Sequence, residues 1–138
     1  MKTVMCFGTF DLLHPGHVNY FEQAKKYGDH LTVVIARDYT KAKMGKKMMF
    51  TETERQHLVA SLKIVDKAVL GYPDNHLSVI QQEKPDILCL GYDQPVEEKE
   101  LQKKLAELSL HPQIKRMKAY QPTIYKSSIL KNKIKTKF

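Results

Sequence analysis

Two histidines three residues apart, His14 and His17, are the side chains of this sequence best placed to do chemistry. They lie in the stretch GTFDLLHPGH (8–17), which directly follows the apolar run VMCF (4–7). Such a run and turn are typical of a buried strand that leads into a helix. Because residues i and i+3 share one face of a helix, we expect both imidazoles to donate hydrogen bonds on the same side.

Glycine and proline surround the two histidines. Gly8 permits a tight turn, Pro15 suits the first turn of a helix, and Gly16 leaves that turn open to a ligand. A helix N-terminus offers unpaired N–H groups and positive potential, and both attract phosphate. We therefore interpret the stretch as a phosphate-binding turn.

Other interpretations of the two histidines stay open. A zinc pair would need further Cys, His or carboxylate ligands, and the other four histidines are scattered, at positions 30, 57, 76 and 111. The histidines could also be ordinary surface or core residues, and the glycines simple turn formers. The sequence predicts no dedicated metal site.

The positive charge is uneven. The formal net charge is +8, and residues 41–47 and 115–138 are rich in lysine, the latter without any acidic residue. A basic surface attracts nucleic acid or the phosphates of a small ligand. A solvated lysine-rich surface explains the C-terminal segment equally well. That segment has few aromatic residues for a nucleic-acid-binding module, so we expect no nucleic-acid partner.

Strand and helix patterns alternate along the chain. Short apolar runs predict five strands, at residues 3–7, 30–36, 67–71, 86–91 and 113–117. Three of these runs are nearly continuous in apolar residues, as strands covered on both faces are. The pattern predicts an α/β fold with a doubly wound, Rossmann-like parallel sheet of five strands and helices on both faces, formed by residues 1–138 as a single domain. Ligands bind such sheets beyond the carboxyl ends of the strands, where the strand order reverses.

Apolar stripes predict the helices between these strands. The stripes consist of Val18, Phe21 and Ala24; of Leu58, Val59 and Leu62; and of Leu101, Leu105 and Leu108. Two shorter helices are predicted at residues 75–83 and 126–134. The sequence TETE (51–54) fits a capping box with Thr51 as the N-cap and Glu54 reaching back.

The two cysteines, Cys6 and Cys89, lie inside apolar runs, which predicts buried free thiols in a reducing compartment. No apolar run approaches the roughly 18–20 residues that cross a bilayer, and the N-terminus has no signal-peptide pattern. We expect a cytoplasmic protein with no membrane partner.

The pattern GTFD followed by HPGH resembles the H-x-G-H signature of the nucleotidylyltransferase superfamily, the cytidylyltransferase-like enzymes. Three further segments resemble the archaeal FAD synthases: VVIARD (33–38), VDKAVLG (65–71) and KPDILCLGYDQ (84–94). The resemblance implies an FMN adenylyltransferase that moves AMP from ATP to FMN and gives FAD and pyrophosphate. The alternatives are a cytidylyltransferase acting on glycerol 3-phosphate, or another adenylyl or cytidylyl transfer to a small phosphate. Cytidylyltransferases carry an Arg near the C-terminus, and this chain has Gln121 near that position, which favours the adenylyltransferase.

The resemblance also implies which residues bind ATP and which are catalytic. It assigns ATP binding to Thr9, Phe10, His14, Pro15, Gly16, His17, Asp93, Tyr120, Ser127 and Ser128. His14 and His17 would be the catalytic pair that contacts the triphosphate, and Asp93 would hold the nucleoside. Ser127 and Ser128 would open a second phosphate-binding helix. Relatives are often dimers, so a homodimer is expected.

Transfer of AMP from ATP requires more positively charged groups near the phosphates than the two histidines supply. Lys43, Lys46 and Lys47 follow the second strand and are placed to reach the leaving pyrophosphate, although a solvated loop explains them nearly as well. A divalent cofactor, Mg²⁺, would be held mainly by nucleotide phosphates and would leave no metal motif. Only the resemblance identifies flavin. The aromatic residues that could form a flavin slot are Tyr39, Phe50 and Tyr92.

Overall fold

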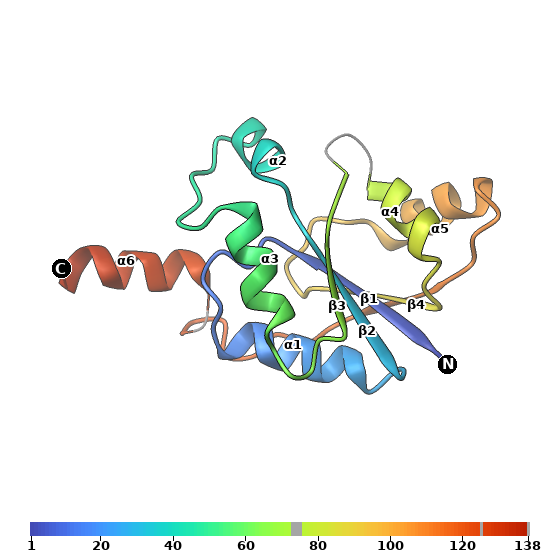
Figure 1. The fold of residues 1–138 in the computed structure, drawn as a ribbon, viewed down its shortest axis with the longest axis horizontal. Helices are drawn as coiled ribbons and strands as arrows, with labels where there is room; N and C mark the ends of the chain where they lie inside the picture. Colours follow the sequence, from blue (N-terminus) through green and yellow to red (C-terminus); the bar gives the residue numbers. More distant parts are fainter. Residues whose placement is uncertain (73–75, 125, 138) are drawn as a thin grey trace.

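A computed structural model describes residues 1–72, 76–124 and 126–137 of the chain. The strands are β1 (Thr3–Gly8), β2 (His30–Ile35), β3 (Lys67–Leu70), β4 (Ile87–Leu90) and β5 (Gln113–Arg116). The helices are α1 (Pro15–Lys25), α2 (Asp38–Lys43), α3 (Glu52–Ala60), α4 (His76–Glu83), α5 (Glu98–Glu107) and α6 (Ser127–Lys137). Figure 1 shows the strands crossing the middle of the molecule with helices around them. Each strand predicted from the sequence is present, with ends that differ by at most one residue.

The five strands form one parallel sheet in the order β3-β2-β1-β4-β5. The predicted α/β fold with a five-stranded parallel sheet is therefore confirmed. From β1 the chain proceeds outward to β2 and β3, and it then returns to β4 on the other side of β1. The strand order thus reverses between β1 and β4, and a crevice opens at the carboxyl ends of these two strands.

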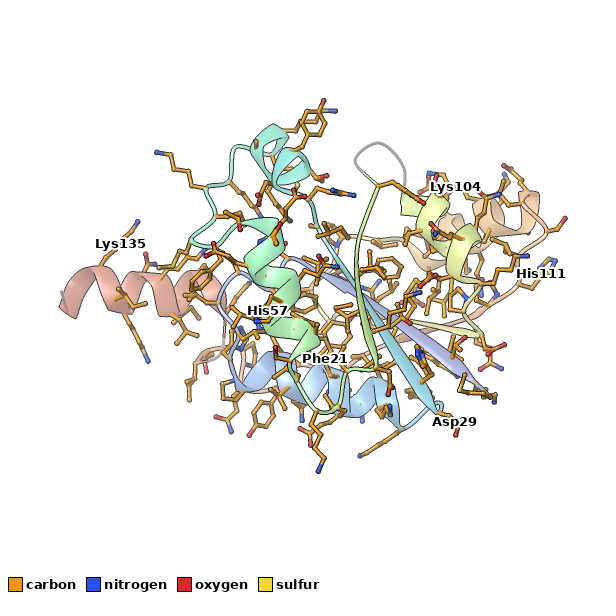
Figure 2. The ribbon with its side chains drawn as sticks, in the orientation of Figure 1. Phe21, Asp29, His57, Lys104, His111 and Lys135 are labelled. Atoms are coloured by element: carbon orange, nitrogen blue, oxygen red, sulfur yellow. The ribbon has the colours of Figure 1, made fainter. Side chains whose placement is uncertain are left out.

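Helices cover both faces of the sheet. On one face, Phe21 and Ala24 of α1 and Val59 of α3 pack on strand residues such as Val4 and Val33. Figure 2 shows Phe21 in this layer, between α1 and the strands. On the other face, α4 and α5 contribute to a second buried cluster that includes Met5 and Leu88. Successive residues of β1 therefore serve opposite cores, as a strand covered on both faces requires.

Two helices lie outside these layers. α6 extends away from the sheet at one end of the molecule (Figure 1). The six-residue helix α2 follows β2 at its carboxyl end and was not predicted, because so short a segment shows no helical period. No helix in the described part of the chain is long and apolar enough to span a membrane.

Three residues of the predicted apolar stripes lie at the surface. Val18 and Leu108 are each 37% exposed and Leu58 is 40% exposed. In α3 the buried positions are Val59 and Arg55, one turn apart. The core-facing stripe of this helix thus passes through a charged residue.

The capping box at the start of α3 is confirmed. The Thr51 hydroxyl accepts from the Glu54 N–H at 3.2 Å, and the Glu54 carboxylate accepts from the Thr51 N–H at 2.9 Å. Cys6 and Cys89 face each other across the β1–β4 pairing as buried free thiols, as predicted. Burial raises the pKa of Cys6 well above its ordinary value.

Candidate active site

A cavity of about 480 Å³ opens at the carboxyl ends of β1 and β4. Its walls come from the loop after β1, the first turn of α1, the loop before α3, the loop after β4, and the segment from β5 into α6. These segments are far apart in the sequence, and the reversal of strand order brings them together.

Most of the residues assigned to ATP binding line this cavity. They are Thr9, Phe10, His14, Gly16, His17, Asp93, Tyr120 and Ser128. Pro15 is the first residue of α1 and is exposed rather than part of the lining. Ser127 begins α6, and its side chain lies outside the described structure.

The other predicted residues divide between the cavity and the outer surface. Lys46 and Lys47 line the cavity, whereas Lys43 stacks its ammonium over the Tyr39 ring, 4.6 Å from the ring centroid. Of the three candidate flavin walls only Tyr92 is in the lining. Tyr39 and Phe50 are absent from the lining: Tyr39 is 53% exposed on α2, and the Phe50 backbone binds Asp11 and Arg55.

The two histidines cap α1. The His14 ring accepts from the Gly16 N–H through Nδ1 at 3.1 Å, and the His17 ring accepts from the His14 N–H through Nδ1 at 3.3 Å. The two rings stack with centroids 3.7 Å apart. A neutral imidazole has one donor and one acceptor nitrogen, so accepting through Nδ1 assigns the proton to Nε2 in both rings.

Both imidazoles are neutral at physiological pH. Burial, together with the adjacent His14 ring, lowers the pKa of His17 to about 3. Burial also lowers the pKa of His14. Each ring that lines the cavity is therefore a neutral imidazole, and neither ring is poised as a proton acceptor from bulk solvent.

The loop between β1 and the histidines is held in an unusual conformation. Phe10 adopts a positive φ of 55° although it carries a side chain. Its buried ring packs on His17, with centroids 5.2 Å apart, and folds back over Gly8. A Cβ on Gly8 would lie 2.4 Å from the Phe10 ring. Gly8 is thus required for the close packing of this ring rather than for a free turn.

Asp11 joins the first loop to two distant segments. It is 3% exposed, and its carboxylate accepts from the N–H groups of Met49 and Phe50 at 2.9 Å each. Lys131 of α6 donates to it at 2.5 Å. Burial alone would raise the pKa of Asp11, but the hydrogen bonds from Lys131 and the two amides outweigh it and lower the pKa. Asp11 stands in the GTFD motif, but no role for it was predicted from the sequence.

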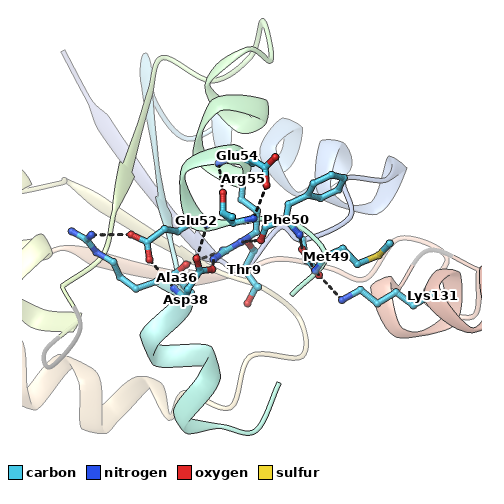
Figure 3. Close-up of polar contacts among 12 residues, drawn as sticks. Thr9, Ala36, Asp38, Met49, Phe50, Glu52, Glu54, Arg55 and Lys131 are labelled. Carbon is cyan, nitrogen blue, oxygen red and sulfur yellow. Dashed lines mark hydrogen bonds and ion pairs between the residues drawn. The ribbon is translucent and has the colours of Figure 1, made fainter. Parts of the chain in front are cut away.

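Arg55 is the second residue that the sequence analysis missed. Its side chain is fully buried, and its guanidinium donates to the carbonyls of Thr9 and Ala36 at 2.8 Å each and of Phe50 at 3.2 Å. It also pairs with the Asp38 carboxylate at 2.7 Å (Figure 3). One side chain thus fixes the loop after β1, the end of β2 and the loop before α3. The available signal was its spacing, four residues before the buried Val59.

Lysines give the cavity a positive lining. The lining cations are Lys46, Lys47, Lys118, Lys126 and Lys131. The lining carboxylates are Asp11, bound by Lys131, and Asp93, whose carboxylate lies 3.8 Å from the Lys126 ammonium. No cluster of three or more His, Cys, Asp or Glu suited to a metal occurs in the described ranges. The cavity can hold a polyphosphate by N–H donors and ammonium groups.

Comparisons with known proteins agree with this chemistry. A family model described as cytidylyltransferase-like matches residues 5–133. An FAD synthase from Picrophilus torridus is 40% identical over 131 residues, which are 95% of this chain and 94% of that protein. An FAD synthase from Thermoplasma acidophilum is 42% identical over 134 residues, 97% of this chain and 94% of that protein.

A solved structure is also similar. The crystal structure described as the lipopolysaccharide core biosynthesis protein from Thermoplasma volcanium superposes with a TM-score of 0.86 and 44% sequence identity. The match covers 88% of this chain and 99% of that one. This chain thus shares its fold with a solved relative over nearly the whole length of that relative.

Proposed function

The chain belongs to the cytidylyltransferase-like family, and we propose that within it this protein is an FAD synthase, which transfers AMP from ATP to FMN and releases pyrophosphate. The relatives that carry this name align with nearly the whole of this chain and of their own length. The enzyme is accordingly a nucleotidyltransferase of FAD biosynthesis, and its substrates are ATP and FMN.

The observation that carries the proposed site is the neutral histidine pair at the start of α1. Because Nδ1 of each ring accepts from a backbone N–H, each ring carries its proton on Nε2, and we assign this N–H to the phosphate oxygens. A hydrogen-bond donor that is held in a fixed orientation does not have to reorganise when negative charge builds up on the transferred phosphate. His14 and His17 are therefore assigned to the triphosphate and to the transition state.

The reaction needs little covalent help. A terminal phosphate oxygen of FMN attacks the α-phosphorus of ATP, the bond to the bridging oxygen breaks, and pyrophosphate leaves with that electron pair. The attacking oxygen is already ionised, so no strong base is required. Positioning and charge stabilisation supply most of the rate in such transfers. Lys46 and Lys47 are assigned to the pyrophosphate, and Asp93 with Tyr120 to the nucleoside.

We propose Mg²⁺ as the divalent cofactor. The lining carboxylates are already paired with lysines, so this donor set fits an ion held by nucleotide oxygens. When bound, Mg²⁺ neutralises phosphate charge. A homodimer and a cytoplasmic location also belong to the proposal, and light scattering on the purified protein tests the first of these.

Pyrophosphate release tests the function. The wild-type protein is incubated with ATP or CTP, each combined with FMN, glycerol 3-phosphate or a sugar 1-phosphate. We expect turnover with ATP and FMN and the appearance of FAD on chromatography. Turnover restricted to CTP and glycerol 3-phosphate would identify a cytidylyltransferase instead, and turnover restricted to a sugar phosphate would identify a nucleotide-sugar synthase.

A further inference from the structure

The hydrogen-bond ladder between β1 and β4 stops at the floor of the cavity. The register pairs three consecutive residues of each strand and ends at the pair that contains Cys89. The Gly8 carbonyl accepts from Ala36 on the β2 side, so the backbone groups of Phe7, one residue earlier, point toward β4. In a continuing ladder, the next two bonds would run from Phe7 N–H to the Cys89 carbonyl and from Gly91 N–H to the Phe7 carbonyl.

Two side chains occupy these two positions. The Tyr20 hydroxyl, from α1, accepts from the Phe7 N–H at 3.4 Å and donates to the Cys89 carbonyl at 2.6 Å. The Gln94 amide donates to the Phe7 carbonyl at 2.6 Å and accepts from the Gly91 N–H at 2.7 Å. Each side chain thus replaces one direct bond of the ladder and satisfies the backbone groups of both strands while keeping them apart.

We propose that Tyr20 and Gln94 form a wedge that holds β1 and β4 apart and sets the width of the crevice in which the reactants meet. This proposal rests on the proposed function, for which both are positioning residues. Both side chains line the cavity. Gln94 directly follows Asp93, so the wedge also fixes where the loop after β4 presents its carboxylate.

The chemistry of each side chain suits a wedge. Gln94 has to donate to one strand and accept from the other, which an amide does and an ionised carboxylate does not. Tyr20 has to donate through its hydroxyl, and burial raises the pKa of that hydroxyl so that it stays protonated. Arg116 supports the same loop from the side of β5, since its guanidinium donates to the carbonyls of Gly91 and Gln94 at 2.9 and 2.8 Å.

Loss of the wedge moves the reactants rather than unfolding the sheet. Without Gln94, the Gly91 N–H and the Phe7 carbonyl either bond directly, which narrows the crevice, or take water between them. Both arrangements shift the loop that carries Asp93 relative to the start of α1. A misplacement of about 1 Å between reacting groups can lower a rate by about 10²-fold.

The first test compares Gln94→Met with Gln56→Met. Methionine fills the space of glutamine without its hydrogen bonds. Gln56 makes a similar bond, from its amide to the Ala68 carbonyl at 3.0 Å, on α3 and outside the cavity lining. We expect Gln94→Met to lose about 10- to 100-fold in kcat/KM for ATP, chiefly in kcat, and Gln56→Met to stay within about twofold.

Calorimetric titration with ATP accompanies the kinetics. An unchanged binding stoichiometry in Gln94→Met shows that the lost turnover is not lost folded protein. A folded Gln94→Met with turnover within about twofold of the wild type overturns the wedge. A wild-type protein that makes no FAD from ATP and FMN contradicts the proposed function instead, so the two failures are distinguishable.

The second test asks whether the two side chains act together. Tyr20→Phe removes only the hydroxyl, and it is measured alone and combined with Gln94→Met. Since either loss alone disturbs the same gap, we expect the double variant to lose less than the product of the single losses. Multiplicative losses overturn the joint role. Should Gln94→Met not fold, Gln94→Glu, which keeps the acceptor toward Gly91, takes its place in the cycle with the same expected result.

Discussion

In the proposed site, the stacked imidazoles of His14 and His17 combine helix capping with hydrogen-bond donation to the ligand. Each ring caps a backbone N–H through Nδ1, and each keeps its proton on the opposite nitrogen. The cap fixes the orientation of the ring, so the donor to the ligand is fixed by the same bond that begins the helix. We therefore expect a change at either position to affect catalysis and the start of α1 together.

Replacement of His17 tests the donor role. We expect His17→Ala to lower kcat by about 10²–10³, as expected for the loss of one preorganised donor to a developing charge. His14→Ala is expected to behave similarly, and ATP calorimetry separates ground-state binding from catalysis. Near-normal turnover of the purified, folded variants would remove the two residues from the catalytic assignment.

The low pKa of His17 predicts a pH dependence of stability. The unfolded chain binds a proton at His17 near pH 6.5, whereas the folded protein does so only at about 3. Between these values the unfolded state holds more protons, so the free energy of unfolding falls as the pH falls. One such group contributes a slope of up to about 1.4 kcal/mol per pH unit.

Urea denaturation between pH 6.5 and 5 measures this slope. Asp11 and Asp38 have lowered pKa values and stay ionised throughout that range. We expect His17→Asn to lose stability less steeply than the wild type as the pH is lowered. Parallel curves for the two proteins would contradict the neutral state of His17.

At the scale of elements, Arg55 links α3 to the ends of β1 and β2. Arg55→Met leaves the carbonyls of Thr9, Ala36 and Phe50 without this donor, and an unsatisfied buried polar group costs about 1–3 kcal/mol. We expect the free energy of unfolding to fall by roughly 3 kcal/mol or more.

A surface ion pair provides the control for Arg55. Lys25 of α1 pairs with Asp66 while both side chains remain about one third exposed. We expect Lys25→Met to change the free energy of unfolding by under about 1 kcal/mol. Equal losses in the two variants, measured by urea denaturation, would show that Arg55 does not support the loops in the way its contacts indicate.

The elements that the sequence predicted well have either an apolar run or a local hydrogen-bond motif. The parallel strands follow from runs such as HLTVVI (30–35), and the start of α3 follows from the local hydrogen bonds of Thr51 and Glu54. Arg55 was missed because hydropathy counts a charged residue as exposed, although its partners are backbone carbonyls that become adjacent only in the folded chain. Asp11 and Gln94 were missed because each binds backbone groups of a distant segment, Met49 and Phe50 for Asp11 and Phe7 for Gln94, that become adjacent only in the folded chain.

The position of the cavity was predicted from the sequence, but some of the residues that line it were not. Strand order decides which loops meet, and the alternation of strands and helices is visible in the sequence. The direction of a loop side chain depends on contacts between distant segments. Tyr39 therefore lies outside the cavity, whereas Lys131 of α6 lies inside it, bonded to a residue 120 positions earlier.

At the scale of the whole molecule, the cavity carries a cluster of positive charge from segments on both sides of the crevice. Lys46 and Lys47 come from the loop before α3. Lys126 directly precedes α6, and Lys131 lies on that helix. This arrangement favours a ligand with several negative charges. Such an attraction is screened by salt, with a Debye length of about 8 Å at 0.15 M ionic strength.

The salt dependence of ATP binding follows from this cluster. We expect the affinity for ATP to fall as the KCl concentration rises, and the double variant Lys46→Met/Lys47→Met to bind ATP more weakly and with a shallower salt dependence. The matched control is Lys103→Met/Lys104→Met on α5, since neither residue lines the cavity. Figure 2 places Lys104 at the end of the molecule opposite α6. Both doubles remove the same net charge, so equal slopes would mean that the overall charge, rather than the lysines at the cavity, attracts the nucleotide.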